Sequence, residues 1–452
     1  MATTLMFQGM RGTGDWVTDQ RPKAWREMIL KLYPNGSVPL TAMLAKMRSE
    51  VVDDAEFNWW ERLLPEQFSA ISAGHAASNN HPVCVDSAGA PGPTAYAGSG
   101  VTGDVLHINL GSGADGLAEQ EKYRVGHTAT SLDSSYYDNH CVGKVTGLTQ
   151  KAGASSTTWY YARVKLLEDD DNGGTVHYED ATHIMICGNI NPELGDTPDP
   201  LAVDPVKVYN YTQIFRTSHG MSRTAMRTRL RTGDYVKQSK LDCLEMHSIE
   251  MEKAFWFSVP SETVGANGKI ERSTGGALWF IYEKDGLTSH YKTHADYAAD
   301  PWLTSGKTWM WKNVLEPVFR NGSREKVAYC GSGALLGIQM LIESGGNFDF
   351  TPMTAAYGIQ VIRWVTPFGT IILKDHPLFT QNPALRYAMA IIDTKNLIYR
   401  YTKGDDTKYL PNRQGNGIDG ELGEYLTEAG LEMHFGPTHM FCGGVGEDNI
   451  LP

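Results

Sequence analysis

A long segment at 234–258 predicts one uninterrupted helix, and this element constrains the fold more than any other part of the sequence. Asp234 suits an N-cap and Pro260 lies just beyond the end, so the helix is bounded on both sides. It would span roughly 35 Å at about 1.5 Å per residue. Because few globular domains contain so long a helix, we expect it to serve as a spine. Its predicted apolar stripe comprises Leu241, Leu244, Met251 and Phe255.

The region from about 101 to 189 shows short alternating strands broken by Gly, Ser and Asp, the pattern of a β-rich loop or small barrel. Strands are expected at 104–110, 159–166 and 183–187. Because their apolar faces are small, we expect this region to complete its burial only on a neighbouring subunit. Pro198 and Pro200 then provide a linker.

Helix and strand signals alternate in the rest of the chain. The spacing at 39–47 is helical, and the aromatic residues Phe57, Trp59 and Trp60 are expected to be core or docking anchors. After residue 275 we predict a strand at 278–282 and helices at 308–319 and 334–343. A hairpin of 359–364 and 370–374, with further strands at 388–393 and 431–435, would complete an antiparallel sheet. The pattern predicts an α+β protein.

Composition excludes several classes of protein. A net charge of −12 argues against a surface devoted to gripping nucleic acid, because phosphate binding needs an excess of Lys and Arg. The chain has no apolar run of transmembrane length, and its first ten residues lack the features of a signal peptide, so we expect folding in a cytoplasm. The six cysteines have no paired spacing and are expected to be reduced thiols.

Two glycine-containing motifs resemble nucleotide-binding sequences but fail in detail. The run 305–308, Ser-Gly-Lys-Thr, matches the end of a phosphate-binding loop, yet Pro301 stands where the first glycine should be. We expect Thr304 or Ser305 to cap a helix that begins near Thr308. The run 329–337 has the order of a dinucleotide fold, but its last glycine is one residue late, and a tight strand-to-helix turn is the better interpretation.

Metal-binding patterns are equally incomplete. A calcium loop starting at Asp169 would close on Asp180 where Glu is expected, so a solvated hairpin turn is favoured. His290 and His294 lie one helical turn apart but lack the Glu and third ligand of a metalloprotease helix. We therefore predict no catalytic residues, no cofactor and no metal, and a protein that is not an enzyme.

Charge is distributed unevenly around the predicted spine helix. Basic residues are concentrated before it and acidic residues along it, and the candidates for inter-subunit contact are Arg223, Arg227, Arg229, Arg231, Asp242, Glu245 and Glu252. The alternative is a solvated polar face, which such charge runs usually form. If the two sets meet between subunits, charge would set docking register and assembly rate more than final stability.

Several blocks resemble the major capsid proteins of tailed bacteriophages, a family with the Johnson fold. They are 38–44 with 56–61, then 210–215 and 222–225 with the long helix to Phe255, then 272–276 with 303–304 and 318–322, and finally 366–373 with 430–433. The second group is the most specific, and the stretch from about 70 to 200 matches least.

The resemblance implies an N-terminal arm and helix at 1–70, a β-rich extended loop or insertion at 71–200, a peripheral domain with the spine helix at 201–274, and an axial domain with returning peripheral strands at 275–452. It also implies self-assembly into hexamers and pentamers of an icosahedral head that encloses double-stranded DNA without sequence-specific binding. Scaffold and portal proteins would be partners, and no membrane would take part. The head would be assembled in the host cytoplasm, and the protein would be located in the virion.

Two other functions remain open from the sequence. The chain could be another virion protein, such as a tail or adhesion subunit, although the repeats usual in a fibre are not visible. A β-rich hydrolase is less favoured, because such an enzyme needs two carboxylates brought together in space and the sequence marks no such pair.

Overall fold

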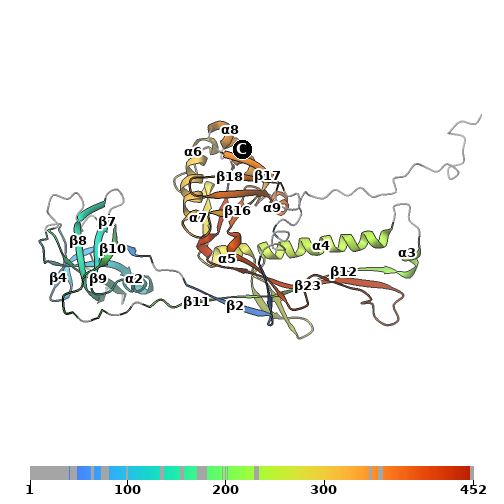
Figure 1. Cartoon of the computed structure of the whole chain (residues 1–452), viewed down its shortest axis with the longest axis horizontal. Helices are drawn as coiled ribbons and strands as arrows, with labels where there is room; N and C mark the ends of the chain where they lie inside the picture. The colour runs from blue at the N-terminus through green and yellow to red at the C-terminus, as the bar shows by residue number, and fades with distance from the viewer. Residues whose placement is uncertain are drawn as a thin grey trace, which may run out of the picture. The chain divides into compact units, whose positions relative to one another are not determined.

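The computed structural model describes residues 40, 48–62, 66–72, 81–97, 100–132, 137–152, 157–169, 181–195, 197–198, 200, 202–228, 234–345, 349–354 and 360–447. The chain divides into two compact units, one formed by 1–61 with 207–452 and the other by 62–206 (Figure 1). The predicted insertion at 71–200 lies inside the second unit. In the described ranges, no helix is long and apolar enough to cross a membrane.

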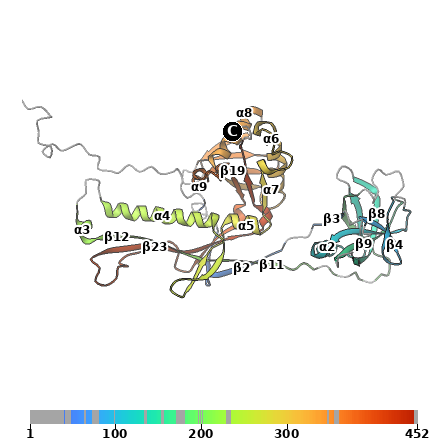
Figure 2. The same ribbon diagram turned by 180° about the vertical axis from the view of Figure 1, so that it is seen from behind.

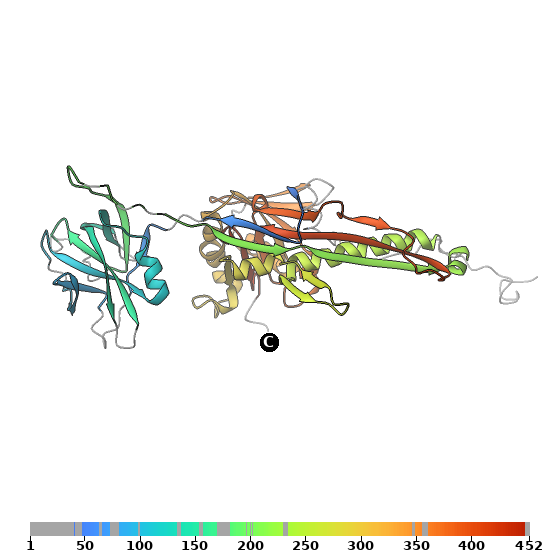
Figure 3. The same cartoon turned by 90° about the horizontal axis from the view of Figure 1, so that it is seen from below.

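One part of the first unit consists of a five-stranded sheet with one long helix packed on it. The strands are β1 (Ser49–Val52), β12 (Gln213–Ser222), β21 (Leu397–Thr402), β22 (Lys408–Leu410) and β23 (Gly420–Met433). Their order is β1-β21-β23-β12, with β22 also paired to β23. The edge strand β1 runs parallel to β21, whereas the other pairs are antiparallel. Helix α4 (Tyr235–Phe257) lies along β12 and β23 (Figures 2 and 3).

Helix α4 begins where the sequence predicted, and its buried row contains Met251 and Phe255 of the predicted stripe. The carboxylate of Asp234 accepts hydrogen bonds from the backbone N–H groups of Val236 and Lys237 and so caps the helix. Leu241 is 65% exposed, so the predicted stripe is wrong at this residue. The residues that face the sheet follow an i, i+4 row, namely Cys243, His247, Met251 and Phe255. The polar His247 fits in this row because its ring bonds to Thr217 and Thr427.

A seven-stranded sheet with helices on it forms the rest of the first unit's core. The strands are β15 (Leu287–His290), β16 (Glu325–Cys330), β17 (Asp349–Thr354), β18 (Gln360–Val365), β19 (Thr370–Asp375), β20 (Met389–Ile392) and β24 (Met440–Gly443). Their order is β15-β24-β20-β16-β19-β18-β17. The helices are α6 (Trp302–Trp309), a π-helical turn (Met310–Leu315), α7 (Glu316–Arg320), α8 (Ser332–Gly345) and α9 (Pro377–Gln381).

The predicted hairpin is confirmed as the antiparallel pair β18 and β19, but the expectation of a wholly antiparallel sheet is wrong. β16 is parallel to β19, and β15 is parallel to β24. Helix α8 follows β16, so the chain crosses over before β19 and can return in the same direction. The predicted strand at 431–435 is the end of β23, which belongs to the five-stranded sheet.

The segment 278–282 was expected to be a strand and is instead helix α5 (Ala277–Glu283). Its β-branched and aromatic residues favour a strand locally. In the folded chain, however, Ala277, Phe280 and Ile281 are buried against the core that α4 also contacts. Tertiary packing therefore overrides local propensity here.

Two small two-stranded elements complete the first unit. One pairs β2 (Glu56–Glu61) with β11 (Val206–Tyr211), and the other pairs β13 (Ser261–Val264) with β14 (Ile270–Ser273). Phe57 and Trp59 of β2 are buried in the core as expected for anchors, whereas Trp60 is 66% exposed. Of the predicted helix at 39–47, only Leu40 is described; it is helical and buried, and 41–47 lie outside the described residues.

The second unit is built around an eight-stranded sheet with its own core. Its strands are β3 (Phe68–Ala70), β4 (Val83–Ser87), β5 (Ala90–Ala95), β6 (Val105–Ser112), β7 (His127–Leu132), β8 (Tyr137–Ala152), β9 (Thr158–Leu166) and β10 (His183–Asn189), with helix α2 (Gly113–Gln120). The strands predicted at 104–110, 159–166 and 183–187 are confirmed as β6, β9 and β10. Ile108, Val145 and Val164 are fully buried, so the expectation that this region needs a neighbouring subunit to bury itself is wrong.

The cysteines of the described chain are free thiols. Cys84, Cys243, Cys330 and Cys442 are buried, whereas Cys187 is exposed. The side chain of Cys141 lies outside the described residues.

Candidate functional site

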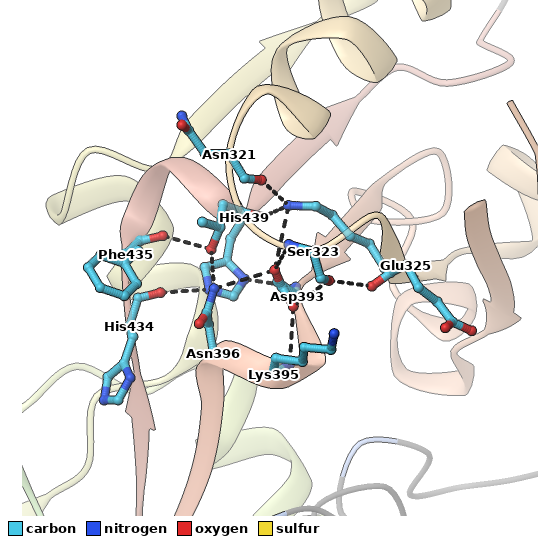
Figure 4. Close-up of polar contacts among 11 residues, drawn as sticks. Asn321, Ser323, Glu325, Asp393, Lys395, Asn396, His434, Phe435 and His439 are labelled. Carbon is cyan, nitrogen blue, oxygen red and sulfur yellow. Dashed lines mark hydrogen bonds and ion pairs between the residues drawn. The ribbon is translucent and has the colours of Figure 1, made fainter. Parts of the chain in front are cut away.

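Lys326 and Asp393 form a fully buried ion pair where the two larger sheets of the first unit meet. Figure 4 shows Asp393 among the polar residues around it. Lys326 lies on β16 of the seven-stranded sheet, and Asp393 follows β20 at the crossing into β21 of the five-stranded sheet. Lys326 Nζ lies 3.9 Å from Asp393 Oδ2 and donates to the carbonyl oxygens of Asn321 and Thr438, at 3.0 and 2.6 Å. The ammonium is thus paired and hydrogen-bonded, as a buried charge requires.

The Asp393 carboxylate is held by donors from two chain segments. It accepts from the backbone N–H of Ser323 at 2.7 Å and from its hydroxyl at 2.8 Å. It also accepts from the N–H of Lys395, because Asp393 caps the short 3-10 helix Thr394–Asn396. A Cβ at Gly322, whose φ is +82°, would lie 2.5 Å from Asp393 Oδ2, so a glycine is required beside this carboxylate.

His439 closes the junction on the side of β24. Its Nδ1 accepts the N–H of Asp393 at 3.1 Å, and its Nε2–H donates to the carbonyl oxygen of His434 at 3.0 Å. Burial lowers the pKa of His439 to about 3, so the ring is neutral at physiological pH. Burial also lowers the pKa of Lys326 to about 8, although the Asp393 charge opposes this shift.

A second ionic cluster adjoins the junction through His434. Its Nε2 donates to Glu432 Oε1 at 2.5 Å, and Arg400 binds both Glu432 and Glu50 of β1. Burial raises the pKa of Glu432, but hydrogen bonds from His434 and Arg400 outweigh it, so this pKa lies below its ordinary value. The neighbouring Glu61 accepts the N–H of Phe435 at 3.1 Å.

The chemistry of this junction is structural. Both charged side chains of the central pair are excluded from solvent, so a substrate has no access to them. The Ser323 hydroxyl bonds to Asp393 and to the Glu325 carbonyl, and His439 has no hydroxyl to activate. In the part of the chain that the structure describes, no group of three His, Cys, Asp or Glu side chains could hold a metal ion.

The two motifs that resemble nucleotide-binding sequences form ordinary structural elements. The run 305–308 lies within α6, which begins at Trp302 with Pro301 as its N-cap, so the cap predicted at Thr304 or Ser305 is wrong. The run 329–337 is the predicted tight turn, in which β16 ends at Cys330 and α8 begins at Ser332. A Cβ on the intervening Gly331 would lie 2.3 Å from a backbone oxygen, which explains the glycine.

The structure also locates residues of the two motifs that resemble metal-binding sites. His290 and His294 flank a short 3-10 helix and both line a groove of about 590 Å³ beside β15. His294 Nε2 lies 2.5 Å from the Asn313 side-chain nitrogen. Asp169 bonds to Thr102, and the rest of the calcium-like loop, 170–180, lies outside the described residues.

The charged residues singled out in the sequence fall in several environments. Arg223 lies on helix α3 (Arg223–Arg227) and pairs with the exposed Asp419 at 2.8 Å, and Arg227 is exposed at the end of the same helix. Asp242 and Glu245 are half-buried on α4. The other two arginines of the set, at 229 and 231, lie outside the described residues.

Part of the basic charge near α4 is balanced within the chain, which the sequence did not indicate. Arg216 binds Glu424 at 2.6 Å, and Lys240 lies 3.6 Å from Glu421. Both acids belong to β23, far away in the sequence but adjacent to β12 and α4 in the fold.

Glu252 must be removed from the set of inter-subunit candidates. Its side chain is fully buried, and its Oε1 accepts hydrogen bonds from the Leu40 N–H, the Trp256 indole and His376 Nε2. Helical spacing placed this residue with the other acids of α4, but the face it occupies turns into the core. It binds the backbone of Leu40 to α4 instead.

The junction residues escaped sequence reasoning because they are single residues drawn from distant segments. Ser323, Lys326, Asp393 and His439 share no motif spacing. The one local signal was Asp393 followed by Thr-Lys-Asn, a sequence typical of an Asp-capped turn.

The chain is therefore an α+β protein organised on a spine helix, with an ionic junction whose role is structural. The model of the SU10 major capsid protein family matches residues 8–445, and the chain belongs to this family. Membership confirms the predicted resemblance to phage major capsid proteins and the predicted fold class, with the sheet correction given above.

Individual relatives are more distant. A major capsid protein of Pseudomonas phage PaMx41 is 23% identical over 271 residues, which cover 56% of this chain and 63% of that protein. Among solved structures, the capsid of a native GTA particle covers 95% of this chain and is itself covered to 97%, with 9% identity and a TM-score of 0.41. The match to the capsid of Myoviridae phage XM1 covers 56% of this chain and 80% of that chain, with 10% identity and a TM-score of 0.36. Both TM-scores are too low to carry an argument.

Proposed function

We propose that this chain is the structural subunit of an icosahedral phage head and acts by assembling with copies of itself. The observation that carries the proposal is the family match over residues 8–445. In this proposal hexamers and pentamers form the shell in the host cytoplasm, scaffold and portal proteins take part, and no membrane is involved. The net charge of −12 supports a shell that encloses double-stranded DNA without sequence-specific binding.

Assembly is the first expected outcome. The full chain, produced in a bacterial cytoplasm together with the scaffold protein of its phage, should yield closed shells in negative-stain electron microscopy. Pentamers and hexamers should be visible on the lattice. A stable monomer under all conditions would contradict the proposal, and fibres or tubes would favour the alternative of a tail or adhesion protein. Turnover of a glycoside would favour the hydrolase.

We further propose that Arg223, Arg227, Arg229 and Arg231 of one subunit face Asp242 and Glu245 of the next. The exposure of Arg227 at the end of α3 supports this, because an exposed cation is accessible to an acidic group of a neighbouring subunit. Arg216 is paired with Glu424 within the chain and is left out of the proposed contact, and Arg223 would have to exchange Asp419 for an acid of the next subunit.

The charge reversal Arg227→Glu is expected to slow assembly at low salt and to leave the subunit folded. The effect should shrink as salt rises, because the Debye length falls from about 8 Å at physiological ionic strength to about 3 Å at 1 M. Light scattering during assembly measures the rate, and circular dichroism checks folding. Lys395→Glu, on the 3-10 helix far from α3 in the sequence, is the matched reversal. Equal rates for Arg227→Glu and the wild type at every salt concentration would identify a solvated face.

A further inference from the structure

A continuous line of polar contacts runs from the N-terminal strand β1 to the buried junction. Glu50 of β1 binds Arg400 of β21, and Arg400 binds Glu432 of β23. Glu432 binds the His434 ring, and the His434 carbonyl oxygen accepts from His439. His439 in turn accepts the N–H of Asp393, whose carboxylate holds Ser323 and Lys326. Every step is a hydrogen bond or an ion pair, so the line joins both sheets.

The contacts in the middle and at the junction end of this line are shielded from water, whereas the side chains of Glu50 and His434 are 27% and 25% exposed. The side chain of Glu432 is 3% exposed and that of Arg400 is 17% exposed, while Lys326 and Asp393 are fully buried. Charge-assisted hydrogen bonds in such surroundings are stronger and more directional than those at a surface. A shift of one member is therefore costly unless its neighbours follow.

Residue 434 is the point where the two clusters meet. Its side chain belongs to the Glu432 cluster and its carbonyl oxygen to the His439 cluster. The next residue, Phe435, has a φ of +53° and is not a glycine, a strained backbone that persists only where surrounding contacts hold it. Its N–H donates to Glu61, and its carbonyl oxygen accepts from the N–H of Thr438 at 2.9 Å and from the Thr438 hydroxyl at 2.8 Å.

We propose that this line couples the pairing of β1 to the packing between the two sheets of the subunit. β1 is an edge strand of only four residues that pairs with β21 alone, and the Glu50–Arg400 bond adds to this short ladder. Release of β1 frees Arg400 on one side, loosens Glu432 and His434, and weakens the hydrogen bonds that position His439 and Asp393. Events that displace the N-terminal strand thereby loosen the junction. The coupling acts within one chain and holds whether or not the chain forms a shell.

Residue-resolved hydrogen exchange on the full chain tests the coupling. The amide of Tyr399, which donates to the Arg48 carbonyl oxygen, reports the pairing of β1. The amides of Asp393 and Ser323 report the junction. In Glu50→Gln and in Glu50→Pro, which also breaks the strand, junction exchange should rise at least about fivefold, the lower end of the coupling found between linked sites. Arg48→Gln is the matched control, since Arg48 contacts Glu50 but is 72% exposed and lies outside the line.

A second variant separates coupling from general loosening. His434→Phe keeps a ring beside Trp59, 5.9 Å away in the wild type, but removes the bond to Glu432. In this background Glu50→Gln should accelerate the Tyr399 amide and leave the junction amides within about twofold of their rates without it, because the line is already cut. Faster exchange at Tyr399 with unchanged exchange at Asp393 and Ser323 in an otherwise wild-type chain would overturn the proposal. If Glu50→Pro does not fold, the comparison of Glu50→Gln in the wild-type and His434→Phe backgrounds decides the test.

Discussion

Asp393→Ala is expected to lower the free energy of unfolding of the first unit by about 3–5 kcal/mol, the loss typical when one partner of a buried ion pair is removed. The substitution leaves the Lys326 ammonium without its counter-ion in a site that excludes water. It also leaves the Ser323 N–H without its acceptor.

Chemical denaturation followed by tryptophan fluorescence measures this loss, since the buried Trp256, Trp302 and Trp309 all lie in the first unit. Asp393→Asn should lose less, because an amide oxygen can still accept the Ser323 N–H. The control is Asp419→Ala, which removes an exposed pair with Arg223 and should change stability by less than about 1 kcal/mol. Equal stability of Asp393→Ala and the control would mean that the buried pair contributes nothing.

The sequence predicted elements whose determinants are local. Helix α4 starts at Asp234 because a carboxylate there caps the first N–H groups, and it stops before Pro260. The hairpin of β18 and β19 surrounds a Pro-Phe-Gly turn that few residues define. Strand β9 is an alternating run that pairs with both its neighbours. In each case the information lies within a short window of the chain.

Predictions failed where distant segments decide the outcome. The helix at 277–283 forms because the core favours it over the strand that its residues prefer. The parallel pairing of β16 with β19 depends on a crossover that no local pattern marks. The exposed side of α4 was misjudged because the row that faces the sheet contains His247, a polar residue whose partners Thr217 and Thr427 come from two other strands.

The candidate site was harder to predict for the same reason. Its residues are ordinary in sequence and become exceptional only by burial, as with Lys326, whose ammonium is fully enclosed. The charge run before α4 could be read directly, but its internal partners on β23 could not. Spacing identified the acids of α4, yet only the fold separates the half-buried Glu245 from the enclosed Glu252.

Glu252→Ala is the other substitution for which we expect a large effect, a loss of about 3 kcal/mol or more in the free energy of unfolding of the first unit. Its Oε1 is the acceptor for three donors: the Leu40 N–H at 2.9 Å, His376 Nε2 at 2.9 Å and the Trp256 indole at 3.2 Å. Each buried donor left without an acceptor costs about 1–3 kcal/mol. The void left by the missing carboxylate adds to this cost.

The same substitution should release the backbone of Leu40, and this separates the role of Glu252 from that of a general core residue. In Glu252→Ala the amide of Leu40 loses its acceptor and should exchange faster with solvent, even under conditions where the unit stays folded. Glu252→Gln retains an oxygen acceptor at nearly the same position and should restore much of the stability. Glu250→Ala, an exposed acid of the same helix that bonds to Thr217, is the matched control and should leave Leu40 protected. The amide of Leu40 could instead exchange at the same rate in Glu252→Ala as in the control. In that case the Glu252 carboxylate does not hold Leu40, and the burial of Glu252 reflects its contacts with His376 and Trp256 alone.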